Sequence, residues 1–183
     1  MRVAVIAKAI GEFGGAEKVT QKVVEYLSER HEIKVITMLD EDSTDRGELG
    51  IMVDEEWSKS AAANAVKFDP DVIYVCGYWG ETAPLYVKNY PVVTMHHDTE
   101  LEALPISDKR KELLFKLTKI RIEKSNAIIV PSRYVMDYLS SRFYARKDKI
   151  FVCHRDSIVS RARCGRDTVR DTGKGKSCCM SAE

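Results

Sequence analysis

Residues 3–27 read VAVIAKAIGEFGGAEKVTQKVVEYL, an order of residue types that predicts a strand, a glycine turn and a helix in succession. Residues 3–7 form a continuous apolar run, as expected for a strand that is buried on both faces. Apolar residues recur over 19–27 with the period of an amphipathic helix. Backbone N–H groups and the positive end of the helix dipole meet at the start of this helix. The stretch therefore predicts the opening of an α/β domain, with a place for an anionic or polyhydroxylated ligand at residues 11–15.

The alternation of strands and helices continues as far as residue 153. Asp69-Pro70-Asp71 marks one boundary, because proline and the residue before it both resist helix, and we interpret it as a turn at the amino edge of the sheet. The alternation predicts a single Rossmann-like α/β domain, with a mostly parallel sheet and helices on both faces. Further strands are predicted at 32–38, 51–53, 72–76, 92–95, 127–130 and 149–153, and helices at 16–30, 58–67, 82–89, 107–124 and 133–143.

The composition argues against several classes of protein. The 29 lysines and arginines balance 28 aspartates and glutamates, so the net charge of +1 gives no reason to expect a nucleic-acid partner. No apolar run approaches the ~20 residues of a membrane span. The chain leads straight into a strand without a signal peptide, so we expect a cytoplasmic protein. A zinc site is not expected, because the sequence has no Cys-x-x-Cys pair.

Residues 1–153 form the predicted domain, and the composition changes after them. Residues 154–183 are polar, basic and nearly free of large apolar side chains. Such a segment buries too little surface to offset the entropy of ordering, so we expect a disordered tail.

Four segments of the chain directly follow predicted strands. In a parallel α/β sheet, ligands bind beyond the carboxyl ends of the strands. We therefore expect the four segments to gather on one rim, and their convergence favours a functional site there more than any one of them does. The segments are residues 11–15, 77–80, 96–100 and 132–133.

His96 and His97 close the strand predicted at residues 92–95. A histidine at a strand end can donate a hydrogen bond to a hydroxyl or a phosphate, or act as a general base. The alternative is a histidine that only bonds a neighbouring loop, and the sequence leaves both interpretations open. A metal ion shared by the pair is disfavoured, because neighbouring residues of a strand point to opposite faces.

The helix predicted at residues 107–124 is rich in lysine and arginine and carries an apolar stripe of Leu113, Leu114, Leu117 and Ile120. A basic amphipathic helix can lie on an anionic membrane. We favour a helix that packs on the sheet and exposes its charged face to water. Peripheral contact with the inner face of the membrane stays open as the alternative.

The segments, in this order, resemble the amino-terminal domain of GT-B glycosyltransferases, in particular the large retaining family 4. In that family the first strand is followed by a loop that ends as Gly14-Gly15-Ala16-Glu17 does here. The resemblance covers about residues 1–153. Its further landmarks are PDVIYV at 70–75, VVTMH at 92–96 and AIIVPSRYV at 127–135.

The resemblance implies transfer of a hexose from a nucleotide sugar to a sugar or a lipid-linked acceptor, with no protein-bound metal and no cofactor. It implies that Gly14 and Gly15 contact the donor diphosphate or the acceptor. His96, the candidate catalytic residue, is implied to lie next to the donor sugar, with His97 as a neighbouring ligand contact. Ser132 is implied to lie near a cleft between two domains.

The sequence departs from the family in its domain content. Family members have a second Rossmann-like domain that binds most of the nucleotide sugar, and no such domain follows residue 153 here. We therefore expect an acceptor-side half that is inactive without a donor-binding domain or subunit, either as a truncated product or as part of a split enzyme. A non-catalytic module that binds a sugar or a phosphate stays open as an alternative. The sequence names neither the sugar nor the acceptor.

Overall fold

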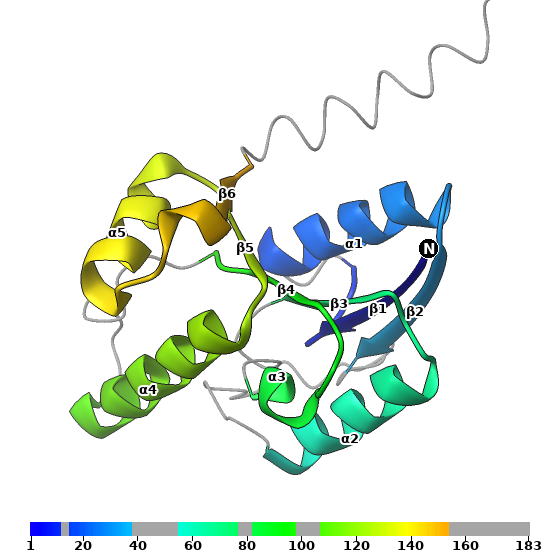
Figure 1. The fold of residues 1–183 in the computed structure, drawn as a ribbon, viewed down its shortest axis with the longest axis horizontal. Helices are drawn as coiled ribbons and strands as arrows, with labels where there is room; N and C mark the ends of the chain where they lie inside the picture. The colour runs from blue at the N-terminus through cyan, green and yellow to red at the C-terminus, as the bar shows by residue number, and fades with distance from the viewer. Residues whose placement is uncertain (12–14, 38–54, 77–81, 98–106, 154–183) are drawn as a thin grey trace, which may run out of the picture.

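The computed structural model describes residues 1–11, 15–37, 55–76, 82–97 and 107–153. In these ranges six strands form one parallel sheet with the order β2-β1-β3-β4-β5-β6 (Figure 1). This sheet confirms the predicted single α/β domain. The predicted strand at 51–53 and the predicted tail at 154–183 lie outside the described residues. The strands are β1 (Arg2–Ala7), β2 (Glu32–Thr37), β3 (Val72–Cys76), β4 (Val92–Met95), β5 (Ala127–Val130) and β6 (Ile150–Val152).

The helices of the described residues lie close to their predicted positions. The helix predicted at 82–89 is shorter in the structure, because the backbone is already extended at Val87 and Asn89 has a left-handed φ of 66°. Ser132 is the N-cap of the last α-helix, as predicted, and its side chain accepts a hydrogen bond from the Val135 N–H at 3.3 Å. The helices are α1 (Gly15–Ser28), α2 (Glu55–Lys67), α3 (Ala83–Tyr86), α4 (Asp108–Lys124) and α5 (Arg133–Phe143), followed by the 3-10 helix η3 (Lys147–Lys149).

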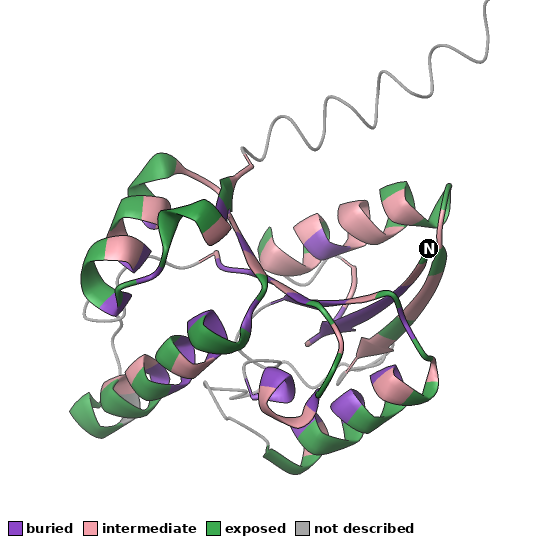
Figure 2. Ribbon diagram, in the orientation of Figure 1, coloured by how far each residue is buried: buried purple, intermediate pink, exposed green. Residues whose placement is uncertain are grey.

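Helices cover both faces of the sheet, as predicted, but they are distributed unequally. The chain moves from β1 to β2 in one direction along the sheet and in the opposite direction afterwards, so right-handed crossovers place α1 on one face and the other α-helices of the described residues on the opposite face. α1 packs there on Val5 and Tyr74, while α2 and α3 pack on Ile6 and Ile73 of the other face. Figure 1 shows α1 across the sheet from α2 and α3, and Figure 2 shows buried residues on the strands and on the helix faces turned toward them.

The buried face of α4 is rotated from the predicted stripe. Leu114 and Leu117 are buried as predicted, but Leu113 is 49% exposed, so its place in the stripe was wrong. Thr118 and Arg121 are buried instead, which continues the spacing i, i+3, i+4, i+7 from Leu114. The sequence pattern missed this face because it gives polar residues no weight on the inner side of a helix.

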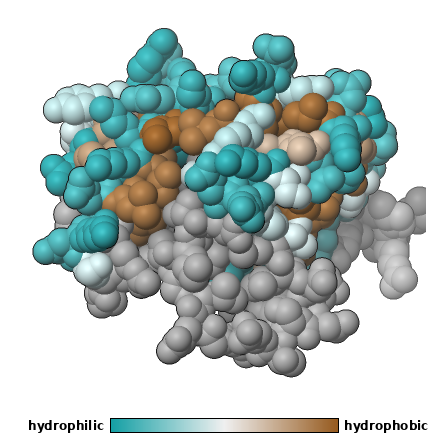
Figure 3. Space-filling model, turned by 90° about the horizontal axis from the view of Figure 1, so that it is seen from below, coloured by the Kyte–Doolittle hydropathy of each residue, from teal (hydrophilic) through white to brown (hydrophobic). Residues whose placement is uncertain are grey.

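α4 packs on the sheet as predicted, because Leu114 and Ile122 share a core cluster with Ile128 of β5, and its outer face is charged. Lys109, Lys116, Lys119 and Lys124 are exposed. Figure 3, which views the side of α2 to α4, shows apolar residues in patches between polar and charged ones. In the described part of the chain, no helix combines the length and the apolar character needed to cross a bilayer. Peripheral membrane contact stays a prediction.

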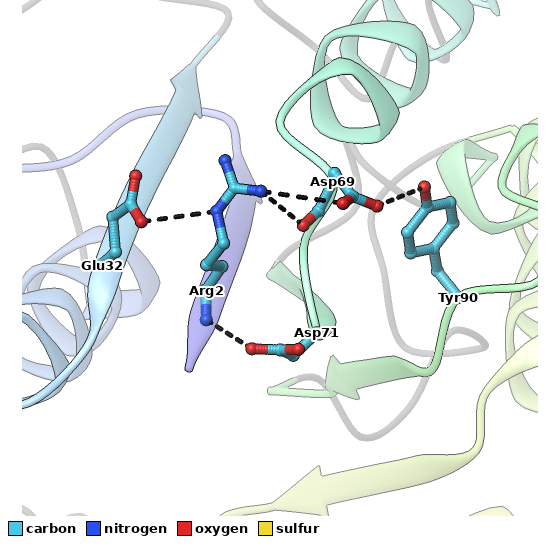
Figure 4. Close-up of polar contacts among 5 residues, drawn as sticks. All are labelled: Arg2, Glu32, Asp69, Asp71 and Tyr90. Atoms are coloured by element: carbon cyan, nitrogen blue, oxygen red, sulfur yellow. Dashed lines mark hydrogen bonds and ion pairs between the residues drawn. The ribbon is translucent and has the colours of Figure 1, made fainter.

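At the amino edge of the sheet, charged side chains link the starts of β1 and β2 to the segment before β3 (Figure 4). The Arg2 guanidinium lies 3.4 Å from Oε2 of Glu32 and donates to the Asp69 carbonyl at 3.0 Å. The Arg2 backbone N–H donates to Oδ2 of Asp71 at 2.7 Å. Asp69 has a left-handed φ of 50° and its side chain accepts from the Tyr90 hydroxyl at 3.2 Å. The segment 69–71 is therefore a turn before β3, as predicted.

Candidate functional site

The strand order places a topological switch between β1 and β3. The chain leaves β1 toward β2 and then crosses back to β3, which lies on the other side of β1. In open α/β sheets, ligands bind outside the carboxyl ends of the strands at this point. Of the four segments predicted to gather on this rim, 132–133 is described completely, 11–15 and 96–100 are described in part, and 77–80 lies outside the described residues.

His96 lies directly beyond β4 and is only 3% exposed. Its backbone N–H donates to the Ile129 carbonyl at 2.9 Å, so the pairing of β4 with β5 extends one residue past β4. Its Nδ1 atom contacts Nη2 of Arg121, which is buried on the inner face of α4. The imidazole of His96 is therefore turned toward the face of the sheet that α4 covers.

His97 is turned toward the opposite face, on which α1 packs. Its Nε2 atom lies 3.4 Å from Sγ of Cys76, the last residue of β3. The Thr20 hydroxyl lies 2.8 Å from the same sulfur and 2.9 Å from the Ala16 carbonyl of α1. These contacts join α1 to the carboxyl ends of β3 and β4. The opposite directions of the two histidines, which strand geometry predicted, are confirmed.

On the face that α1 covers, burial raises the pKa values of two side chains, Cys76 and Tyr74. It raises the pKa of the Cys76 thiol, and the hydrogen bonds with Thr20 and Tyr74 oppose this increase only in part. Burial also raises the pKa of the Tyr74 phenol well above its ordinary value, and this phenol donates to Sδ of Met95 at 2.9 Å. Both groups stay protonated at neutral pH, so the structure does not offer Cys76 as a thiolate nucleophile.

The other predicted site residues also lie at the carboxyl edge where they are described. Gly15 is exposed as the first residue of α1, so its backbone belongs to the electropositive end of that helix. Gly14 lies outside the described residues. Ser132 follows β5, and its side-chain oxygen caps α5. The roles of these residues in ligand binding stay predictions.

Two polar residues near this edge escaped the sequence analysis. Arg121 lies on the inner face of α4, and its spacing from Leu114 and Leu117 is the signal that could have revealed it. Thr20 is the buried residue of α1, although it follows Val19 in an amphipathic pattern. Neither residue type is expected inside a helix packing face, because a buried polar group needs a partner that the sequence does not show.

The described part of this edge holds a helix N-terminus at Gly15 and the side chains of His96 and His97. A helix N-terminus and histidine side chains suit phosphate oxygens and sugar hydroxyls. Within the described ranges, no three side chains of His, Cys, Asp or Glu gather into a group that could hold a metal ion.

Solved structures of other proteins share the fold of this chain. The crystal structure of Anabaena Alr3699/HepE in complex with UDP and glucose matches with a TM-score of 0.54 and 15% identity, covering 92% of this chain and 51% of that chain. The UDP-N-acetylglucosamine 2-epimerase from Rickettsia bellii matches with a TM-score of 0.58 and 13% identity, covering 94% of this chain and 49% of that chain. At this identity the matches show the fold alone, a GT-B-like Rossmann-type domain.

The family follows from the sequence of the domain. The model of the family described as Glycosyltransferase Family 4 matches residues 13–155, which is most of the chain. The chain therefore belongs to glycosyltransferase family 4, and the predicted resemblance is confirmed. The chain spans about half the length of the solved structures that it matches. No curated protein matches its sequence.

Proposed function

We propose that this chain is the acceptor-side half of a hexosyltransferase that uses a nucleotide sugar, and that it is inactive until a donor-binding half is supplied. The observation that carries this proposal is the family 4 match over residues 13–155 of a chain that spans about half of its structural neighbours. A transferase of two domains holds its substrates between them, so one domain alone cannot exclude water from the reaction.

The structural neighbours support the proposal of a nucleotide sugar as the donor. One neighbour is in complex with UDP and glucose, and the other acts on UDP-N-acetylglucosamine. In this chain, the N-terminus of α1 begins at Gly15 and suits a diphosphate. His96 and His97 carry ring N–H groups that suit sugar hydroxyls. We assign the donor sugar to the neighbourhood of His96, and assign the remaining ligand contacts to Gly14, Gly15, His97 and Ser132.

The acceptor is proposed as a sugar or a lipid-linked sugar. The exposed lysines of α4 can bring the chain to the inner face of an anionic membrane, where a lipid-linked acceptor is held. Transfer is proposed to need no cofactor and no protein-bound metal, because phosphate charge can be stabilised by backbone N–H groups and a helix dipole.

The test is a transfer assay on the purified full chain. Labelled UDP-glucose, UDP-N-acetylglucosamine and GDP-mannose are incubated with saccharide and lipid-linked acceptors, with and without the donor-binding half of a family 4 glycosyltransferase fused after residue 153. We expect no transfer above background by the chain alone and measurable transfer by the fusion. Substantial transfer by the chain alone would refute the half-enzyme proposal.

A calorimetric titration separates transfer from binding alone. A fusion that transfers nothing, together with a chain that binds sugars or phosphates, would favour the alternative of a non-catalytic binding module. Binding of mononucleotides in place of acceptors would point to a different use of the same rim.

A further inference from the structure

A groove runs along the outer side of α5, at the end of the sheet that β6 forms (Figure 1). Its volume is about 630 Å³. This volume lies within the ~300–1,000 Å³ of sites that bind small molecules. We name it the α5 groove. It is lined by six residues that the proposed transfer does not use: Tyr134, Asp137, Tyr138, Ser140, Ser141 and Lys147.

The sequence of α5 places most of this lining on one face of the helix. Val135, Leu139 and Phe143 recur every four residues and are buried in the core cluster beside β5 and β6. A second stripe, with spacings of three and four residues, lies on the other side of the helix and lines the groove. Its members are Tyr134, Asp137, Tyr138 and Ser141.

Two tyrosine rings form the aromatic part of the groove. Tyr134 is 59% exposed, so a ligand can reach the face of its ring. Tyr138 is half-buried and lies one helical turn further on, about 6 Å along the helix axis. Its ring makes an edge contact with Phe143 of the core, with 5.8 Å between the ring centroids. The core therefore orients one of the two rings before a ligand arrives.

The polar part of the groove carries both donors and acceptors but no net charge. Nζ of Lys147, in η3, donates to Oδ1 of Asp137 at 2.9 Å, and both side chains are more than half exposed. An exposed ion pair of this kind contributes little to stability and stays hydrated. Ligand hydroxyls can therefore replace water on both groups at small cost. The Ser141 hydroxyl donates to the Tyr138 carbonyl at 3.2 Å, and its oxygen still has acceptor capacity.

We propose that the α5 groove binds a neutral oligosaccharide. A sugar ring has an apolar face that suits a tyrosine ring, and its hydroxyls both donate and accept hydrogen bonds. Two tyrosine rings one helical turn apart suit consecutive sugar units. Binding itself does not depend on the proposed function. The assignment of this saccharide as the acceptor does rest on it.

The lining disfavours other classes of ligand. The single ammonium of Lys147 is balanced by the Asp137 carboxylate, so the groove has no excess of cations for a nucleotide or a phosphorylated sugar. The described lining contains no leucine, isoleucine, valine or methionine, so the apolar anchors of a peptide would find no aliphatic pocket.

A titration of the full chain, followed by NMR of its backbone amides, tests the proposal. The neutral probes are maltopentaose, cellopentaose, mannopentaose and chitopentaose, and the charged probes are glucose 6-phosphate and UDP. We expect at least one neutral probe to shift the amide signals of α5 and η3 in a saturable way. The charged probes should affect these signals less, wherever else on the chain they bind.

Three tyrosine variants show whether the groove itself binds the probe. Tyr134→Ala should weaken binding by about tenfold, the upper range for one aromatic contact. Tyr134→Phe keeps the ring and should keep most of the affinity. Tyr144→Ala is the matched control, because Tyr144 is 86% exposed and does not line the groove, and it should bind as the wild type does.

The proposal would be overturned if no neutral probe shifted the signals of α5 and η3 in the wild-type chain, a result that needs no variant to fold. Equal affinity in Tyr134→Ala and the wild type would also overturn it. Tighter binding of a charged probe at these signals would refute the class of ligand.

The fusion described above tests the role of the groove in transfer. Tyr134→Ala should raise the KM for an oligosaccharide acceptor by about tenfold and leave kcat nearly unchanged, because it removes binding that is remote from the reacting atoms. An unchanged KM would refute the assignment of the bound saccharide as the acceptor. Absence of transfer in every fusion would count against the proposed function alone, since the NMR titration does not depend on transfer.

Discussion

Two arginines lie at opposite edges of the same sheet and are held in different ways. At the amino edge, Arg2 contacts Glu32 and Asp69, and its side chain is 40% exposed (Figure 4). At the carboxyl edge, Arg121 is 3% exposed and contacts His96. Exposed ion pairs contribute little to stability, because water screens them and already solvates both partners. A buried guanidinium has lost that solvation and depends on the few groups around it.

The difference supports the proposal that the carboxyl edge of the domain binds the ligand. At the amino edge the charged groups lie at the starts of the strands, and β1, β2 and β3 pair through their backbones. At the carboxyl edge, polar groups are buried beside the strand ends and are oriented by helices. Such an arrangement is costly in a fold, and it is common where a site must be rigid before its ligand arrives.

The largest expected effect concerns Gly15 in the transferring fusion. Gly15→Val should lower transfer by about 1000-fold, because a branched side chain at the helix N-terminus blocks close approach of a diphosphate to the backbone. The measurement is the rate of transfer from labelled nucleotide sugar. Gly15→Ala is the matched control and should retain more activity. Unchanged turnover in the valine variant would remove the glycine turn from the site.

The next effect concerns the stability of the carboxyl edge. His96→Ala should lower the free energy of unfolding by about 2 to 3 kcal/mol, because it leaves the buried Arg121 guanidinium without this acceptor. Urea denaturation of the isolated chain measures it. His97→Ala is the control, and it should cost about 1 kcal/mol or less, since it removes only a long contact with Cys76. An equal decrease in the free energy of unfolding in His96→Ala and His97→Ala would contradict the expected difference between the two faces of the sheet.

The loss of stability at alkaline pH should depend more on Tyr74, which is buried in the core, than on Tyr90 at the amino edge. Burial raises the pKa of Tyr74, so above pH ~10 the unfolded chain releases a proton that the folded chain retains, and stability falls as pH rises. The slope from this group approaches 1.4 kcal/mol per pH unit at most, by the conversion of one pKa unit into free energy. Tyr74→Phe should flatten the fall between pH 9 and 11 (about one unit around the ordinary tyrosine pKa).

Tyr90→Phe is the matched variant for this pH series. Burial and the hydrogen bond to Asp69 raise the pKa of Tyr90 as well, but this tyrosine lies at the amino edge and is only half-buried. Its substitution should change the alkaline slope less than that of Tyr74. A steeper change in Tyr90→Phe than in Tyr74→Phe would contradict the assignment of alkaline sensitivity to the core.

The smallest effect is expected for Arg2. Arg2→Ala should lower the free energy of unfolding by less than about 1 kcal/mol, because its partners Glu32 and Asp69 return to water when it is removed. Thermal or urea unfolding at low salt and at 0.5 M salt (a concentration of roughly the range that screens surface charges) measures the loss. If Arg2→Ala lowered the free energy of unfolding as much as His96→Ala does, the two edges would not differ in how strongly they depend on their arginines.

The sequence predicted the fold well because most of its signals are local. Apolar runs located the six observed strands, and Ser132 was recognised as a helix cap from its position after β5. The segment Asp69-Pro70-Asp71 was recognised as a turn because proline limits the backbone whatever surrounds it. The helix before β4 was predicted too long, since its end depends on the backbone at Val87 and Asn89 and no strong stop signal precedes them.

The candidate site was predicted in position but not in its contacts. Strand ends converge in any parallel sheet, so the placement of His96 and Ser132 at one edge follows from the order of elements. The order of elements does not determine which face of α4 turns inward. The sequence analysis therefore missed the buried Arg121 and wrongly placed Leu113 in the buried stripe.

By itself the sequence determined that this chain is a parallel α/β domain of the family 4 type, with glycine and histidine residues at the carboxyl ends of its strands. Only the tertiary structure decided that His96 meets Arg121, 25 residues away, while His97 meets Cys76. The physical reason is that the spacing of apolar residues along the sequence indicates which face of a helix or strand is buried, and this depends on local sequence alone. The partner across that face is selected by how the layers pack, which depends on the whole chain.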